Sequence, residues 1–157
     1  MARDLSNVHE YRCQLTWSGS TGVGYDDYDR SHRVAAPPAE QELELSGDRA
    51  FGGDAALPNP EQLVVVAASS CQLLSFLAIC ARARIDVVDY SDEATAVMPE
   101  DDEPMRITAI ELRPRIVVAG DVSEERIRRY VALAHEQCYI ANSLRTEIKI
   151  DPRIDFA

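Results

Sequence analysis

Alternation of apolar and polar positions, the pattern typical of a strand with one buried face, recurs along this chain. In 42–45 glutamates alternate with leucines, and in 105–119 one parity is apolar while the other carries Glu111, Arg113 and Arg115. Pro114 inside that segment predicts an edge strand or a bulge, because proline has no N–H for the ladder. The predicted strands are 8–17, 25–34, 40–46, 87–98, 105–119 and 145–150.

A helix is predicted to begin after the loop 47–58. Asn59 can cap it, Pro60 suits the first helical position, and Glu61 lies in the first turn, where the helix dipole favours an acid. The helical run continues to about Arg84 and contains 18 residues without charge, 63–80, which is at the edge of the length that spans a bilayer. Four polar residues in the run and the lack of a flanking basic cluster favour a helix buried in a core or at a dimer interface.

A second helix is predicted after Ser123, whose side chain can cap it. Its apolar residues recur at i, i+3, i+4 and i+7, so one face is suited to a core; they are Ile127, Tyr130, Val131 and Ala134. Strands therefore precede and separate two helices without a βαβ repeat. The order predicts an α+β fold with antiparallel hairpins, formed by a single domain over residues 1–157.

Charge and cysteine content restrict the partners and the compartment. A formal net charge of −11 argues against binding nucleic acid through its phosphates and against anionic membrane surfaces. Residues 1–11 contain no apolar signal region. With four cysteines and no secretory start, we expect a cytoplasmic protein with buried or reactive thiols and no disulfide framework.

Two of the thiols lie in contrasting surroundings. Cys71 lies in the uncharged helical run, and Cys138 directly follows the amphipathic helix. A thiolate in an apolar wall with a second thiol at hand can reduce an electrophile and close a disulfide, although the local sequence around each cysteine by itself favours inert packed thiols. Cys13 and Cys80 are interpreted as core thiols. His135 and Cys138 have metal-ligand spacing but lack a second pair of ligands, so neither a metal nor a cofactor is expected.

Three segments together resemble a known family. They are Asn59-Pro60-Glu61-Gln62-Leu63 followed by Cys71, then Cys138-Tyr139-Ile140-Ala141-Asn142-Ser143-Leu144, and Tyr25-Asp26-Asp27-Tyr28-Asp29-Arg30-Ser31-His32. Their spacing and the order of elements are similar to those of the OsmC/Ohr family, the osmotically inducible protein C and organic hydroperoxide resistance proteins. The resemblance covers about residues 8–150.

The resemblance implies an intertwined homodimer in which antiparallel sheets wrap long central helices. It also implies an antioxidant peroxidase that reduces organic hydroperoxides and is regenerated by a dithiol, such as a lipoylated protein. Cys71 would be the peroxidatic cysteine, Cys138 the resolving cysteine, and Glu61 the carboxylate that positions an arginine. Arg30 is the preferred arginine, with Arg33 as the alternative three residues away.

The chemistry of the residues leaves two functions open. In the first, Cys71 reduces a peroxide beside a wall of Leu73, Leu74, Phe76 and Tyr139, which favours bulky alkyl groups. Tyr139 stands where many family members have proline, a difference that bears on how freely Cys138 moves. In the second, the same scaffold binds a small apolar or electrophilic ligand, and the thiols are incidental or sense redox state.

Overall fold

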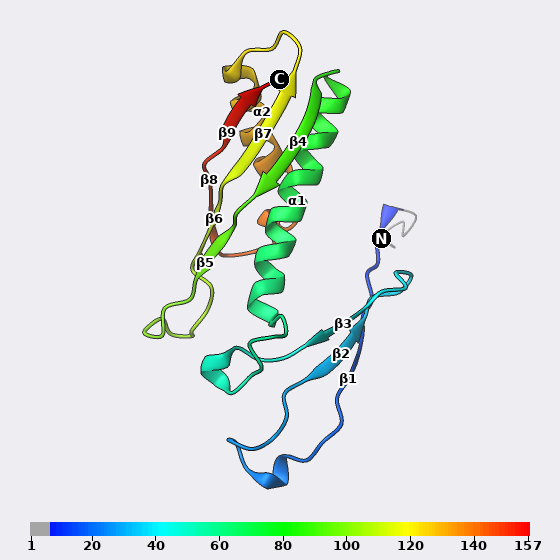
Figure 1. Ribbon diagram of the computed structural model, residues 1–157, viewed down its shortest axis with the longest axis vertical. Coiled ribbons are helices and arrows are strands. Elements are labelled where there is room, and N and C mark those ends of the chain that lie inside the picture. The colour runs from blue at the N-terminus through cyan, green and yellow to red at the C-terminus, as the bar shows by residue number, and fades with distance from the viewer. Residues whose placement is uncertain (1–6) are drawn as a thin grey trace, which may run out of the picture. The chain divides into compact units, whose positions relative to one another are not determined.

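The computed structural model describes residues 7–157, which form two compact units. One unit ends at Gln62 and the other comprises Leu63–Ala157. Figure 1 traces the elements of each unit in chain order. The expectation of a single domain stays a prediction, and each unit is described by itself below.

The first unit contains a three-stranded antiparallel sheet in the order β1–β2–β3. Its strands are β1 (Gln14–Thr16), β2 (His32–Ala35) and β3 (Glu42–Leu45), with short 3-10 helices η2 (Thr21–Val23) and η3 (Arg49–Phe51). The predicted strand 40–46 is confirmed by β3, whereas of the predicted strands 8–17 and 25–34 only 14–16 and 32–34 are strand. Before β2 the Asp29 carboxylate accepts the Ser31 N–H at 2.8 Å, and such a local bond holds the backbone in a turn.

Helix α1 (Pro60–Arg82) begins as the sequence predicts and ends two residues early. The Asn59 side chain accepts the Gln62 N–H at 2.8 Å, and the Gln62 side chain accepts the Asn59 N–H at 3.0 Å. This reciprocal capping box satisfies two of the N–H groups that a helix start leaves unpaired. The start of α1 is therefore fixed by neighbours in the sequence alone.

By length and composition α1 would also suit a membrane span, with a mean hydropathy of 2.2 over its most apolar window. In this structure its inward face instead packs against protein through Ala68, Gln72, Phe76, Ile79 and Cys80. Its opposite side stays exposed, including Val66 and Leu74. We therefore interpret α1 as a helix that packs against the protein core along one face and leaves its opposite face exposed.

The second unit contains two three-stranded sheets and both long helices. One sheet has the order β4–β7–β9, from β4 (Asp86–Asp92), β7 (Pro114–Ala119) and β9 (Arg153–Phe156). The other has the order β5–β6–β8, from β5 (Thr95–Val97), β6 (Ala109–Leu112) and β8 (Glu147–Ile150). Helix α2 (Glu124–Gln137) is capped by Ser123, as predicted, and the 3-10 helix η4 (Ala141–Ser143) follows it.

Each long strand predicted in this unit is broken in two. The segment 87–98 forms β4 and β5, and 105–119 forms β6 and β7 with the break at Arg113. The Asp92 carboxylate accepts the Arg113 N–H at 2.7 Å, which removes that N–H from the ladder. The sequence predicted an edge position or a bulge at Pro114. Pro114 is buried as the first residue of β7, a central strand, so the edge position is wrong, and the strand is instead interrupted one residue earlier, at Arg113. A first position tolerates proline because no ladder N–H is needed there.

The sheets contain the expected antiparallel pairs and also two parallel pairs that were not predicted. Strand β8 pairs in parallel with β6, and β9 pairs in parallel with β7. The chain reaches both final strands only after crossing through α2, and such a crossover permits parallel pairing. Strand β9 was not predicted from the sequence. The mixed α+β class is confirmed.

One hydrophobic core holds α1, α2 and the β4–β7–β9 sheet together. Its fully buried members include Phe76 from α1, Ile116 and Val118 from β7, and Ile127 from α2. A smaller cluster joins Ala68 of α1 to β6 through Ile110 and Leu112. Figure 1 shows both helices on the same face of the β4–β7–β9 sheet. The predicted apolar faces of 105–119 and of α2 are the faces that are buried.

Candidate thiol site

The structure brings Cys71 and Cys138 together within the second unit. Cys71 lies half-buried in the middle of α1, and Cys138 is the C-terminal cap residue of α2, only 1% exposed. Burial raises the pKa of the Cys138 thiol, and hydrogen bonding with the Cys71 side chain raises it further. Both thiols are free. The two thiols are therefore neighbours within the second unit.

Packing between the two helices fixes this contact. Gln72, the residue after Cys71, is 1% exposed and donates its side-chain amide to the Val131 carbonyl of α2 at 3.0 Å. The side-chain amide oxygen of Gln72 is buried and has no hydrogen-bond partner among the described residues. Since Cys138 ends the helix that Gln72 contacts, this bond ties the backbone of both thiols to one rigid core.

The turn after α2 wraps around Cys138. Asn142 donates its side-chain amide to the Glu136 carbonyl at 2.9 Å and to the Cys138 carbonyl at 3.0 Å. The Ala141 N–H points at the Cys138 sulfur at 3.4 Å. The N–H groups of Ala141 and Ile140 lower the pKa of Cys138, against the larger effect of burial. The turn therefore offers hydrogen-bond donors to a thiolate at this position.

A cavity of about 420 Å³, here called the thiol cavity, opens beside Cys71. Cys71 lines it and Cys138 does not. Of the wall predicted from the sequence, Leu74 and Tyr139 line it, but Leu73 lines another cavity and Phe76 is fully buried in the core. The complete lining is Ala67, Ser70, Cys71, Leu74, Ser75, Ala78, Arg82, Gln137, Tyr139 and Ile140.

Arg30 is held inside the first unit by an aromatic pair. Its guanidinium donates to the Tyr28 carbonyl at 3.0 Å and to the Tyr25 carbonyl at 2.7 Å. The same group lies over the Tyr28 ring at 4.0 Å and the Tyr25 ring at 4.8 Å, within cation–π range. Gly52 (φ 80°) closes the cage, because a Cβ there would lie 2.8 Å from the guanidinium carbon. Arg30 is thus a positioned cation.

Glu61 and Arg30 line one cavity of about 460 Å³, together with Trp17 and His32. No ion pair joins the two side chains among residues 7–157. Arg33 is exposed on β2 opposite Glu44 and does not line this cavity. Of the two arginines considered, only Arg30 faces the same cavity as Glu61.

The four predicted site residues thus form two pairs, one in each unit. Glu61 and Cys71 share α1 but are ten residues apart, about 15 Å of helix, so they do not touch along it. The sequence did not single out Gln72 or Asn142. The absence of glycine after α2 was the available signal for Asn142, because a helix end without glycine needs another partner for its carbonyls.

The two remaining cysteines behave differently from each other. Cys80 is buried as predicted, and burial raises its pKa to about 11 despite the opposing charge of Arg126. Cys13 is exposed and precedes β1, so its interpretation as a core thiol is wrong. Within residues 7–157 no group of three or more metal-ligating side chains is assembled.

Comparisons with known proteins agree with this architecture. The family model described as OsmC-like protein matches residues 52–153, about two thirds of the chain. An OsmC-like protein of unknown function from Vibrio cholerae has a similar structure, with a TM-score of 0.83 and 28% identity, covering 92% of this chain and 99% of that one. A search of curated proteins found no similar sequence.

Two structures named as organic hydroperoxide resistance proteins share the fold at lower identity. The one from Legionella pneumophila is 18% identical, with a TM-score of 0.68, covering 96% of this chain and 99% of that one. The one from Elizabethkingia anophelis is 18% identical, with a TM-score of 0.70, covering 97% of this chain and 99% of that one. The chain therefore belongs to the OsmC-like family.

Proposed function

We propose that this protein is a cysteine-based peroxidase that reduces organic hydroperoxides to alcohols. The observation that carries the proposal is the contact between a cavity-facing thiol, Cys71, and a fully buried one, Cys138. An electrophile that enters from solvent can reach Cys71 but not Cys138. Cys138 is in place to react with Cys71 once Cys71 has been oxidised. The names of the Legionella and Elizabethkingia relatives supply the substrate class.

The reaction proceeds in three balanced steps. The Cys71 thiolate attacks the terminal peroxide oxygen, the O–O bond breaks, and the alkoxide leaves as an alcohol after taking a proton. The resulting Cys71 sulfenic acid condenses with the Cys138 thiol, which forms the disulfide and releases water. An external dithiol, such as a lipoylated protein, then reduces the disulfide and is itself oxidised.

Arg30 and Glu61 complete the proposal as supporting residues. A guanidinium stays charged at all relevant pH values and can stabilise both a thiolate and the negative charge on a leaving alkoxide. Arg30 already has its orientation fixed by two carbonyls and two rings. Glu61, on the wall of the same cavity, is the carboxylate proposed to position it.

We further propose that the functional unit is a cytoplasmic homodimer. Val66, Leu74 and Leu77 are 60%, 64% and 36% exposed on the side of α1 opposite its buried face. An uncovered apolar stripe on a 23-residue helix favours a protein partner, and a second copy of the chain presents a matching stripe. Four free thiols are consistent with a reducing compartment.

The decisive experiment treats reduced protein with one equivalent of tert-butyl hydroperoxide and measures intact mass with peptide mapping. We expect the loss of two hydrogens, mapped to a Cys71–Cys138 link within one chain. Cys71→Ser should abolish peroxide turnover, Cys138→Ser should stop at a sulfenic acid and then over-oxidise, and Cys13→Ser should behave as wild type. Full turnover by Cys71→Ser would reject the mechanism, and two unreacted thiols would favour the ligand-binding alternative.

A further inference from the structure

The two sulfurs of the proposed site differ in their access to an incoming molecule. Cys71 lines the thiol cavity, whereas Cys138 is 1% exposed and lies outside its lining. The residues on either side of Cys138, Gln137 and Tyr139, both line the cavity. The residues beside Cys138 therefore form part of the cavity wall, whereas Cys138 itself does not line the cavity.

Access matters because a disulfide can be opened at either sulfur. An attacking thiolate forms a new bond to one sulfur and displaces the other, so the choice of sulfur decides which cysteine carries the mixed disulfide. We infer that the reductant enters through the thiol cavity and attacks Cys71, so that Cys138 is the leaving sulfur. This inference rests on the proposed Cys71–Cys138 disulfide and adds the direction in which it is reduced.

Burial raises the pKa of Cys138 and so makes it a poorer leaving sulfur, an effect that the turn around it partly offsets. As the S–S bond breaks, the electron pair goes to Cys138, where the Ala141 N–H lies 3.4 Å from the sulfur. Asn142 holds this turn by bonding the carbonyls of Glu136 and Cys138. A hydrogen-bonded thiolate is a better leaving group than a bare buried one, so the turn offsets part of the cost of burial.

The full reduction then balances with one dithiol. Its first thiolate bonds to Cys71 and releases the Cys138 thiolate, which takes up a proton. Its second thiolate attacks the reductant's own sulfur in the mixed disulfide, closes a disulfide within the reductant and releases the Cys71 thiolate. Once the Cys71 thiolate has also taken up a proton, the protein has gained two electrons and two protons, and the dithiol has lost the same. Cys71 thus reacts with both the peroxide and the reductant.

The test uses the full chain with Cys13→Ser, which removes the exposed thiol. Diamide forms the disulfide without any peroxide, glutathione then opens it, and acid quenching followed by N-ethylmaleimide labels the released thiol. Peptide mapping should place glutathione on Cys71 and maleimide on Cys138 in at least tenfold excess over the reverse. Equal or reversed labelling, or no mixed disulfide at either cysteine, would overturn the inference.

A second measurement tests the route. Ala78 lines the thiol cavity, whereas Ala96 is exposed on β5 and does not. Ala78→Phe should slow opening of the disulfide by glutathione at least tenfold, and Ala96→Phe should leave it unchanged, with folding of each variant checked by circular dichroism. Equal rates would contradict entry through the cavity. Because diamide replaces peroxide, failure of the peroxidase proposal appears separately, as a protein that reacts with glutathione at Cys71 but not with hydroperoxide.

Discussion

At the residue scale, four thiols of one chain differ in reactivity because their surroundings differ. Cys13 is exposed, while burial raises the pKa of Cys80 to about 11. At pH 8 a thiol of that pKa is a thiolate about one time in a thousand, and only the thiolate is alkylated. We predict that iodoacetamide modifies Cys13 at least ~100-fold faster than Cys80, as measured by peptide mapping. In denaturant the two rates should converge; fast labelling of Cys80 in the native protein would contradict the prediction.

Gln72 permits a test of how a buried polar side chain affects the free energy of unfolding. Its amide nitrogen bonds the Val131 carbonyl, while its oxygen is buried without a partner. Gln72→Leu loses one hydrogen bond but also removes the unpaired acceptor, so the free energy of unfolding should change by only about 1 kcal/mol. Gln72→Glu places an unpaired charge in the same space and should cost about 3 kcal/mol or more. Urea unfolding of both variants measures the difference, and equal losses would show that burial of charge is not the cause.

The sequence predicted the two site cysteines but not the side chains that position them. The spacing of Cys71 and Cys138 within recognisable motifs pointed to a pair, although a separation of 67 residues along the chain says nothing of their distance in space. Gln72 bonds a carbonyl 59 residues away that only the folded chain brings to it, and Asn142 bonds carbonyls six and four residues before it that the sequence analysis did not single out. The cage around Arg30 depends on the backbone of a turn within 25–34, a segment that the sequence analysis predicted to be a strand.

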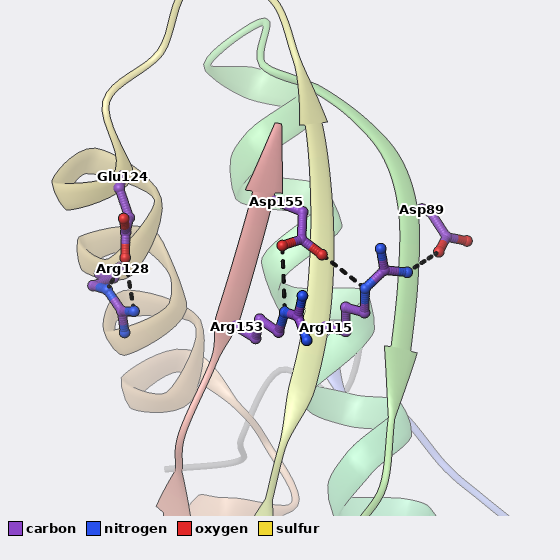
Figure 2. A network of polar contacts seen from close by, with 6 residues as sticks. All are labelled: Asp89, Arg115, Glu124, Arg128, Arg153 and Asp155. Atoms are coloured by element: carbon purple, nitrogen blue, oxygen red, sulfur yellow. Dashed lines mark hydrogen bonds and ion pairs between the residues drawn. The ribbon is translucent and has the colours of Figure 1, made fainter. Parts of the chain in front are cut away.

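At the element scale, the outer face of the β4–β7–β9 sheet carries a ladder of opposite charges (Figure 2). Asp155 of β9 accepts hydrogen bonds from Arg115 of β7 at 2.8 Å and from Arg153 at 3.3 Å. Desolvation works against ionisation of Asp155, but the two arginines outweigh it and hold its pKa below the ordinary value of 3.8. The charged form is therefore favoured in the folded protein, and β9 is anchored to the sheet partly by this contact.

The sign of the pH effect follows from that lowered pKa. The unfolded chain binds the Asp155 proton more readily, so the contribution to stability is complete above about pH 4 and is lost as pH falls through the folded-state pKa. Asp155→Asn should therefore lower the urea midpoint more at pH 7 than at pH 3. Glu10→Gln, in an exposed pair with Arg12, is the control and should show no such difference. A pH-independent effect of Asp155→Asn would contradict the assigned cause.

Local signals explain which elements were predictable. Both helices begin at caps whose partners are within three residues, so their starts could be read from the sequence. The broken strands could not, because the break at Arg113 depends on Asp92, which lies 21 residues earlier. Strand β9 is four residues long and exists through its pairing with β7, a contact that no local pattern encodes.

At the scale of the whole molecule, the uncovered side of α1 is the feature that most needs a partner. Exposed leucine and valine side chains on one helix are costly to leave in water, by about 25 cal/mol for each Å². The first unit adds to this, because Leu15 and Leu43 of its sheet are 60% and 42% exposed. Apolar surface on both units is consistent with a second copy of the chain completing the core.

The final prediction tests this dimer through one substitution on α1. Val66 is 60% exposed in the single chain, so Val66→Glu should be tolerated by a monomer within about 0.5 kcal/mol. Buried at a dimer interface, the unpaired carboxylate should cost about 3 kcal/mol or more and weaken association by at least ~100-fold. The control is Val88→Glu, at a similarly exposed position on β4. Sedimentation of the wild type and both variants shows whether the protein is a dimer and whether only Val66→Glu weakens it. A monomeric wild type, or dimers of equal affinity in all three, would remove the proposed role of α1 and assign its apolar side to another partner.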